Sequence, residues 1–241
     1  MKITQSKLLN NFKNTTSFFT TRASGNLAFH VDDNYENVLL NHQHLASELN
    51  YDKKTLVHMK QIHSDIVLAI DDNDNFENPP TCDALITDKL NTPLMVMVAD
   101  CSPILFYDHE QRVIAVAHAG RQGAFKNIVK NVIDSFIDNY SSNPKNIYVS
   151  IGASIGRCCY EVGSEVYEEV KLLDLEYAIE KREKSYYLDI GKILKTQLLS
   201  CRIDEKNIEI SKECSCCLSD KYFSYRTDRD TGRFCGVIIL K

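Results

Sequence analysis

LMVMVADCSPILFYDHEQRVIAVAHAGRQG, residues 94–123, is the stretch that organises the chain. It contains two apolar runs, 94–99 and 113–117, which are too short for isolated helices and rich in β-branched residues, so they predict buried neighbouring strands separated by a polar turn. Asp100 and Cys101 follow the first run, and His118 follows the second. We therefore expect a thiol and an imidazole to meet at the same edge of one sheet.

The composition is that of an ordinary globular protein. The chain has 241 residues, 44% hydrophobic and 25% charged, which is enough for one large core and a single domain over residues 1–241. The formal charge of −5 argues against a nucleic-acid partner, because phosphate backbones are bound by clustered Lys and Arg. No apolar run approaches the length of about 18 residues that spans a membrane, and the first residues lack a signal-peptide core. We expect a cytoplasmic protein with small-molecule partners and no membrane partner; the sequence indicates no oligomeric state.

Nine cysteines occur in the chain. Because the chain is neither short nor expected to be exported, free thiols and metal ligands are better interpretations than disulfides. Cys214, Cys216 and Cys217 resemble half of a zinc ribbon without its second half, and Cys158 and Cys159 are adjacent rather than spaced for chelation. The spacing therefore favours structural thiols in both groups.

Periodicity predicts the remaining elements. Strands are expected over residues 17–22, 55–59, 65–70, 147–151 and 186–188, and helices over 35–49, 124–140, 162–173 and 190–201. Asp33 or Asn34 is placed to cap the first helix. The apolar positions of 124–140 share one face, so this helix should pack on the sheet. Residues 222–226 and 234–240 are expected to form a terminal hairpin.

Three reactive side chains, His63, Cys101 and His118, each lie in a short polar segment beside a predicted strand. Two histidines and one cysteine make a known open zinc site, in which the fourth position is left for water. Cys101 and His118 would equally serve as a nucleophile and a base if they were in hydrogen-bond contact. A single buried Cys or His is more often a packing residue. Residue type alone leaves these alternatives open.

A series of short motifs runs in order from about residue 18 to residue 240: Phe19-Thr-Thr-Arg22, Gln61-Ile-His63, Asp83-Ala-Leu-Ile-Thr87, Ala99-Asp-Cys101-Ser-Pro-Ile-Leu105, Ala117-His118-Ala-Gly120, residues 152–162, and Phe223-Ser-Tyr-Arg226 through Gly232-Arg233. Together they resemble the laccase-domain family, whose members are also called multicopper polyphenol oxidases or purine nucleoside phosphorylases. The resemblance implies a single domain of mixed α/β class, with mixed central sheets flanked by helices and a fold similar to that of cysteine–histidine hydrolases.

The resemblance also implies a metal ion, zinc with copper as the alternative, held by His63, Cys101 and His118. The implied reactions are phosphorolysis of adenosine, methylthioadenosine, inosine and guanosine to a base and ribose 1-phosphate, and deamination of adenosine to inosine. The implied partners are therefore a purine nucleoside and phosphate. In deamination, zinc would lower the pKa of a water molecule toward about 7; in phosphorolysis, arginines would hold phosphate near the anomeric carbon.

Four residues of the terminal motifs are the candidates for substrate binding: Arg22, Asn26, Arg226 and Arg233. Guanidinium groups bind phosphate by forked hydrogen bonds, although most loop arginines are solvated or ion-paired. The chain departs from the family pattern after Ala-His-Ala-Gly, where Trp-Arg-Gly is usual and Arg121-Gln122-Gly123 stands here. The Trp is absent and the cation has moved by one position, so substrate choice is implied less firmly than metal binding.

Three other functions stay open. A metal-free hydrolase or amidase would use Cys101 as its nucleophile and His118 as its base. A copper-dependent phenol oxidase is disfavoured, because four-electron reduction of oxygen needs several coppers and the chain has only seven histidines. A non-enzymatic interaction protein stabilised by zinc would have a closed site, with a fourth ligand such as Cys82 or His58.

Overall fold

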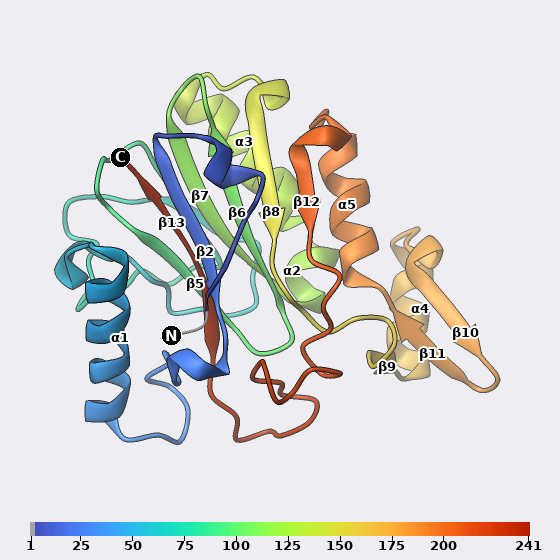
Figure 1. The fold of residues 1–241 in the computed structure, drawn as a ribbon. Coiled ribbons are helices and arrows are strands. Elements are labelled where there is room, and N and C mark those ends of the chain that lie inside the picture. Colours follow the sequence, from blue (N-terminus) through green and yellow to red (C-terminus); the bar gives the residue numbers. More distant parts are fainter. Residues whose placement is uncertain (1–2) are drawn as a thin grey trace.

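A computed structural model describes residues 3–241 as one mixed α/β domain built in layers (Figure 1). The helices are α1 (Tyr35–Leu49), α2 (Arg121–Phe125), α3 (Ile128–Tyr140), α4 (Ser164–Leu172) and α5 (Ile190–Ser200). The strands are β1 (Ile3–Gln5), β2 (Thr15–Thr20), β3 (Val67–Ala69), β4 (Ala84–Thr87), β5 (Leu94–Val98), β6 (Ser102–Asp108), β7 (Val113–Ala119), β8 (Ile147–Ile151), β9 (Glu161–Val162), β10 (Ile179–Arg182), β11 (Ser185–Leu188), β12 (Ile208–Ile210) and β13 (Phe234–Leu240). No helix within residues 3–241 is long and apolar enough to cross a membrane.

Two sheets packed against each other form the centre of the domain. The first has the strand order β1-β2-β13-β5 and is antiparallel. The second has the order β12-β8-β6-β7-β4-β3 and is antiparallel in its middle, with parallel pairs at its two edges. Apolar side chains such as Val96, Leu105 and Val116 fill the space between the sheets. A small third sheet, β10-β11-β9, lies beside α4 (Figure 1).

Helices cover the outer faces of both central sheets (Figure 1). α3 and α5 pack on the six-stranded sheet, where Phe136 and Ile104 share one buried cluster. α1 packs on the four-stranded sheet, where Leu45 shares one buried cluster with Phe18 and Val237. Removing one such aromatic side chain, as in Phe136→Ala, would cost about 3–5 kcal/mol of unfolding free energy. The strands of the centre are therefore buried on both faces, which explains their nearly continuous apolar runs.

Several sequence predictions are confirmed by these elements. α1 covers the predicted range, and the Asn34 side chain caps it by accepting hydrogen bonds from the backbone N–H groups of Glu36 and Asn37. β8 and β11 form at the predicted strands. α4 and α5 form within a few residues of the predicted helix limits.

The two apolar runs that opened the sequence analysis do form strands, but the prediction that they are neighbours in one sheet is wrong. β5 pairs with β13 in the four-stranded sheet, whereas β7 pairs with β4 and β6 in the six-stranded sheet. Residues 102–108, expected to belong to a polar turn, form β6 and are buried throughout. Their Ile-Leu-Phe-Tyr core is apolar enough to occupy the middle of a sheet. The chain thus changes sheets between β5 and β6.

Three other predictions are corrected. The helix expected over 124–140 is interrupted at Asn127, whose φ of 61° ends α2 and whose side chain caps α3. The strand expected over 55–59 is a short 3-10 turn at Lys53–Thr55 followed by a single bridge from Val57 to Leu94. The terminal hairpin is also wrong: β13 is a strand, but residues 222–226 form turns because their polar groups bond to Asp100 instead of to β13.

Candidate active site

Cys101 lies where the chain crosses from β5 in one sheet to β6 in the other. Asp100, just before it, adopts a φ of 83°, a left-handed conformation that Asp tolerates better than most residues. The Asp100 carboxylate holds the turn by accepting hydrogen bonds from Ser215 Oγ (2.6 Å), Ser224 Oγ (3.1 Å) and the backbone N–H of Arg226 (2.7 Å). The same carboxylate therefore fixes Cys101 and the carboxy-terminal segment relative to each other.

His118 lies inside β7, opposite Pro103 of β6, rather than after the strand as the sequence predicted. Its Nδ1 is 2.8 Å from Oδ1 of Asp83, the residue just before β4. Both side chains are buried, with exposed fractions of 3% and 0%. Because Nδ1 donates to the carboxylate, the ring is fixed with Nε2 turned toward the site.

His63 lies on a loop that Asp83 also holds. The Asp83 carboxylate accepts hydrogen bonds from the backbone N–H groups of His63 (3.1 Å) and Ser64 (2.6 Å). The Gln61 side chain bonds to the backbone of Met97 in β5 through both its nitrogen (2.8 Å) and its oxygen (2.9 Å). These contacts explain the Gln-x-His motif: Gln61 docks the loop on a strand, and His63 then faces the site.

The structure brings the three predicted residues together. The donor atoms of His63, Cys101 and His118 all lie within 4.8 Å of one another, and Cys101 Sγ is 4.0 Å from His63 Nε2. The two imidazole rings meet edge to face with centroids 4.7 Å apart. Gly120 makes this packing possible, since a Cβ there would lie 2.8 Å from Cys101 Sγ. This close approach accounts for the glycine of the Ala-His-Ala-Gly motif.

Cys101, His118 and Asp83 stabilise one another's charged forms. Burial alone would raise the pKa of the Cys101 thiol, but His118 and His63 beside it lower that pKa to about 6. Burial alone would lower the pKa of His118, but Cys101 and Asp83 raise it to about 9. Hydrogen bonds from His118 and Ser64 overcome burial and lower the pKa of Asp83 to about 2. Without a metal ion, Cys101 and His118 thus form a thiolate–imidazolium pair at neutral pH.

The donor set also fits a metal ion. Two imidazoles and one thiolate suit zinc or copper, and a carboxylate behind a ligating histidine, as Asp83 stands behind His118, is the usual support of such a ligand. Within residues 3–241, the donor group at this point consists of the three predicted residues. Cys82 is buried in the core between the sheets, and His58 bonds to the carbonyl oxygen of Phe76. The closed site that a purely structural zinc would require is therefore not formed with Cys82 or His58.

Two cavities meet at Cys101. The first has a volume of about 540 Å³ and contains three cationic and two aromatic side chains, Arg121, Arg226, Arg229, Tyr160 and Tyr225. The second has a volume of about 400 Å³ and contains the three donor residues together with His30, Gln61, Tyr225 and Arg233. Tyr225 and Cys101 line both cavities. The Cys101 side chain is therefore accessible from both cavities.

The predicted arginines are placed differently from one another. Arg226 lines the first cavity, and its Nη2 donates to the carbonyl oxygen of Glu161 (2.9 Å). Arg233 lines the second cavity. Arg22 instead stacks over Phe223, 4.7 Å from the ring centroid, and is not a lining residue of these two cavities.

Asn26 is also not a lining residue of either cavity. Its side-chain oxygen accepts a hydrogen bond from the backbone N–H of Arg233 (2.8 Å), so it supports a residue that does line the second cavity. Substrate contact by Asn26 stays a prediction.

Four residues of the first cavity were not candidates from the sequence: Tyr160, Tyr225, Arg121 and Arg229. Arg121 stood out only as a departure from the family pattern, and it forms an ion pair with Glu169 of α4. Arg229 follows Arg226 by three residues in the same segment, which is the one signal in the sequence that associates them.

The comparisons with known proteins agree with this architecture. The family described as multi-copper polyphenol oxidoreductase laccase matches residues 15–241. The chain is similar to purine nucleoside phosphorylase YlmD of Geobacillus stearothermophilus (31% identity, 90% of this chain and 83% of that protein). It is also similar to purine nucleoside phosphorylase CA_C1699 of Clostridium acetobutylicum (35% identity, 93% and 91% covered).

Solved structures give the same result for the fold. The hypothetical protein YfiH of Bacillus licheniformis superposes with a TM-score of 0.89 at 31% identity, covering 94% of this chain and 93% of that chain. YlmD from Geobacillus stearothermophilus superposes with a TM-score of 0.86 at 27% identity, covering 95% and 93%. The family model covers nearly the whole chain, and the fold of these neighbours is the one described above. The chain belongs to the multi-copper polyphenol oxidoreductase laccase family.

Proposed function

We propose that this protein is a cytoplasmic, zinc-dependent purine nucleoside phosphorylase that cleaves adenosine and, as further substrates, methylthioadenosine, inosine and guanosine. The observation that carries the proposal is the first cavity, in which three arginines and two tyrosines surround the exposed side of Cys101. Its volume of about 540 Å³ is in the usual range for small-molecule sites. The similarity to proteins named purine nucleoside phosphorylase supports the same substrate class.

The cavity offers separate groups for the two substrates. Arg226 and Arg229 supply forked donors for phosphate, and Tyr160 and Tyr225 supply aromatic surfaces for a purine. Arg226 is already oriented, since its guanidinium group bonds to the carbonyl oxygens of Cys159 (3.3 Å) and Glu161 (2.9 Å). Fixed donors are more effective than mobile ones, because less freedom is lost when the anion binds.

Arg233 of the second cavity is a further candidate for the phosphate clamp. Arg22 and Asn26 do not line these cavities, and we propose that they contribute to substrate binding indirectly. Arg22 would act through its contact with Phe223, and Asn26 through its hydrogen bond with Arg233. Separate substitution of each residue ranks these contributions.

In phosphorolysis, a phosphate oxygen bonds to the anomeric carbon as the bond from that carbon to the purine nitrogen breaks, and the purine takes up a proton. The arginines would hold the anion against this carbon and balance its charge. His63, Cys101 and His118 would hold zinc, or copper as the alternative, with His118 oriented by Asp83. When bound, such a metal would polarise a substrate oxygen or lower the pKa of a water molecule, which is also the chemistry that deamination of adenosine to inosine requires.

The decisive experiment incubates metal-analysed protein with adenosine, with and without phosphate, and separates the products. We expect adenine and ribose 1-phosphate only when phosphate is present, and inosine in both reactions. If no free base is released in a phosphate-dependent way from adenosine or from any other proposed nucleoside, the phosphorylase assignment is rejected. Formation of inosine without adenine would support only the deaminase activity.

A metal-free cysteine hydrolase is the second candidate, and one observation favours it. Asp83, His118 and Cys101 stand in the order carboxylate, imidazole and thiol, the arrangement that activates a nucleophilic cysteine. For this function, verified metal removal should leave activity intact and thiol alkylation should abolish it. The phosphorylase proposal expects metal removal itself to abolish activity.

A further inference from the structure

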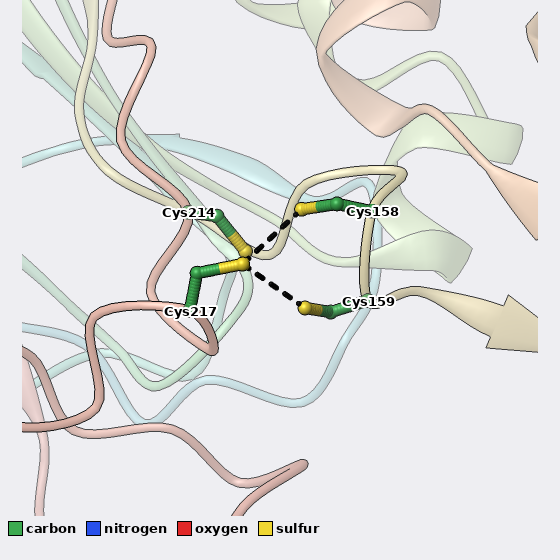
Figure 2. A group of neighbouring side chains, drawn as sticks. All are labelled: Cys158, Cys159, Cys214 and Cys217. Atoms are coloured by element: carbon green, nitrogen blue, oxygen red, sulfur yellow. Dashed lines mark hydrogen bonds between the residues drawn. The ribbon is translucent and has the colours of Figure 1, made fainter.

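Four other cysteine side chains converge about a point that the site described above does not include (Figure 2). Cys158 and Cys159 lie on the loop between β8 and β9, whereas Cys214 and Cys217 lie on the segment between β12 and β13. Their four Sγ atoms all lie within 4.8 Å of one another. Figure 2 shows the thiols of the two segments pointing toward one another. The sequence favoured two separate groups of structural thiols, and the structure joins them into one.

The backbone explains why the thiols meet. Ser154 and Cys214 form an isolated parallel bridge, and the backbone N–H of Ser215 donates to the carbonyl oxygen of Ser154 (3.0 Å). After Cys214 the chain makes a helical turn, in which the N–H of Leu218 donates to the carbonyl oxygen of Cys214 (3.0 Å). Residues three apart in such a turn share a face, so Cys217 points the same way as Cys214.

The sulfur positions are those of a metal site rather than of a disulfide. Cys217 Sγ lies 3.4 Å from Cys158 Sγ and 3.3 Å from Cys159 Sγ, both well beyond the bond length of about 2.05 Å in a disulfide. Four thiolates about 2.3 Å from a central zinc ion would stand about 3.8 Å apart. The nearly equal distances from Cys217 to its two neighbours fit such a shell, whereas a disulfide would single out one neighbour.

One sulfur already has the support that metal thiolates commonly have. The backbone N–H of Gly156 donates to Cys214 Sγ over 3.2 Å. Arg226 donates to the carbonyl oxygen of Cys159 (3.3 Å), and Arg182 donates to that of Arg157 (3.4 Å), so two guanidinium groups lie along the Cys158–Cys159 loop. Positive charge here would offset the excess negative charge that four thiolates and one divalent ion carry.

We propose that Cys158, Cys159, Cys214 and Cys217 bind one zinc ion as a closed tetrathiolate site. Soft thiolate donors in tetrahedral number select zinc or iron, and four protein ligands leave no open position, so this zinc is structural. Cys214 and Cys217 supply the ordinary Cys-x-x-Cys half of such a site. The adjacent pair Cys158-Cys159 replaces the usual second half.

The site would tie together the two segments that form one wall of the first cavity. Ile155 and Tyr160 come from the loop that carries Cys158 and Cys159, and Tyr225, Arg226 and Arg229 come from the segment that carries Cys214 and Cys217. Zinc here would act by positioning that wall. The proposal does not depend on which reaction the cavity supports.

The test measures zinc and iron per chain in protein purified without chelator. To separate the two sites, metal is measured in Cys101→Ala protein, with and without Cys217→Ser. We expect Cys217→Ser to remove one equivalent of zinc in either background. Cys216→Ser is the matched control, since Cys216 belongs to the same turn but not to the group of four; it should retain the metal. Cys158→His should also retain it, because a histidine nitrogen can replace one thiolate.

A second measurement needs no substitution among the four cysteines. Cobalt replaced into Cys101→Ala protein, which lacks the thiolate of the other site, should show strong thiolate-to-cobalt absorption, and a mercurial that blocks thiols should release the remaining zinc. Denatured wild-type protein treated with chelator should show all nine thiols free. Two thiols fewer than nine, iron in place of zinc, or zinc content unchanged by Cys217→Ser would each overturn the proposal.

Discussion

Nδ1 of His118 in β7 lies 2.8 Å from Oδ1 of Asp83, the residue just before the paired strand β4, and both side chains are buried. The same carboxylate accepts hydrogen bonds from the backbone of the loop that carries His63. One buried anion therefore orients two of the three candidate metal ligands. Cys101, the third, is held by Asp100 in the adjacent crossing. Each ligand thus owes its position to an acidic residue that does not itself enter the donor set.

We predict that Asp83→Asn weakens metal binding by about 10- to 100-fold, the usual effect of removing the carboxylate behind a ligating histidine. An amide also presents an N–H group where the carboxylate accepted from backbone N–H groups, so the thermal midpoint should fall as well. Competition with a chelator of known affinity measures the first effect. Asp88→Asn, at an exposed carboxylate just after β4, is the control and should bind metal normally. Unchanged affinity in Asp83→Asn would show that the His118 contact is only structural.

Cys101→Ala should lose one equivalent of metal and the nucleoside activity together, because the thiolate is both a ligand and the group where the two cavities meet. Metal analysis by mass spectrometry and a product assay on the same sample measure both. Cys201→Ser, at the end of α5, is a thiol control that should change neither. Full zinc content in Cys101→Ala would remove the candidate metal site, and full activity after verified metal removal would favour the hydrolase alternative.

Arg226→Ala and Arg229→Ala should each raise the phosphate KM, weakening phosphorolysis by roughly ten- to a hundred-fold, since a charge-assisted hydrogen bond contributes about 1.5–3 kcal/mol. Phosphate-independent deamination should suffer less. Arg22→Ala and Arg233→Ala are assayed in the same way to test the arginines predicted from the sequence. Lys206→Ala, an exposed cation distant in sequence, is the control. If no arginine variant selectively impairs the phosphate-dependent reaction, the phosphate clamp is wrongly assigned.

His63, Cys101 and His118 can be selected from the sequence because they carry recognisable motifs and reactive side chains. The structure brings their donor atoms together, and their binding of a metal stays a prediction. The reason given for that convergence was incorrect, since Cys101 and His118 come from different sheets. A continuous apolar run shows that a strand is buried on both faces. Such a run has no alternation of apolar and polar residues, so it does not indicate which other strand pairs with it.

The spacing of residues along the sequence could not predict contacts between distant segments. Cys159 and Cys214 are far apart in sequence, and neither segment has a complete zinc-binding pattern, so only the fold shows that they meet. Asn127 illustrates a local failure, because the apolar periodicity of 124–140 runs through a residue whose left-handed backbone breaks the helix. The turn at 222–226 depends on Asp100, which lies more than a hundred residues away.

A last prediction concerns His42 of α1, which is fully buried beside the rings of Phe29 and Phe76. Its Nε2 donates to the carbonyl oxygen of Leu27 (2.8 Å), Nδ1 has no partner, and the ring stacks on Phe29 with centroids 5.4 Å apart. Burial, helped by the nearby His58 and Lys53 and opposed by the hydrogen bond to Leu27, lowers the pKa of His42 to about 4. The folded protein therefore holds this imidazole neutral.

Because the folded pKa lies below the ordinary value of 6.5, the contribution of His42 to stability is fully present above pH 6.5 and is lost as the pH falls toward 4. At 1.36 kcal/mol per pKa unit, the loss reaches about 3 kcal/mol. His42→Gln keeps a donor for Leu27 but cannot be protonated, so its thermal midpoint should fall less between pH 7 and pH 4 than that of the wild type. His44→Gln, on the exposed side of α1, controls for substitution of a histidine and should follow the wild-type curve. Parallel wild-type and His42→Gln curves would mean that protonation of His42 does not couple to unfolding.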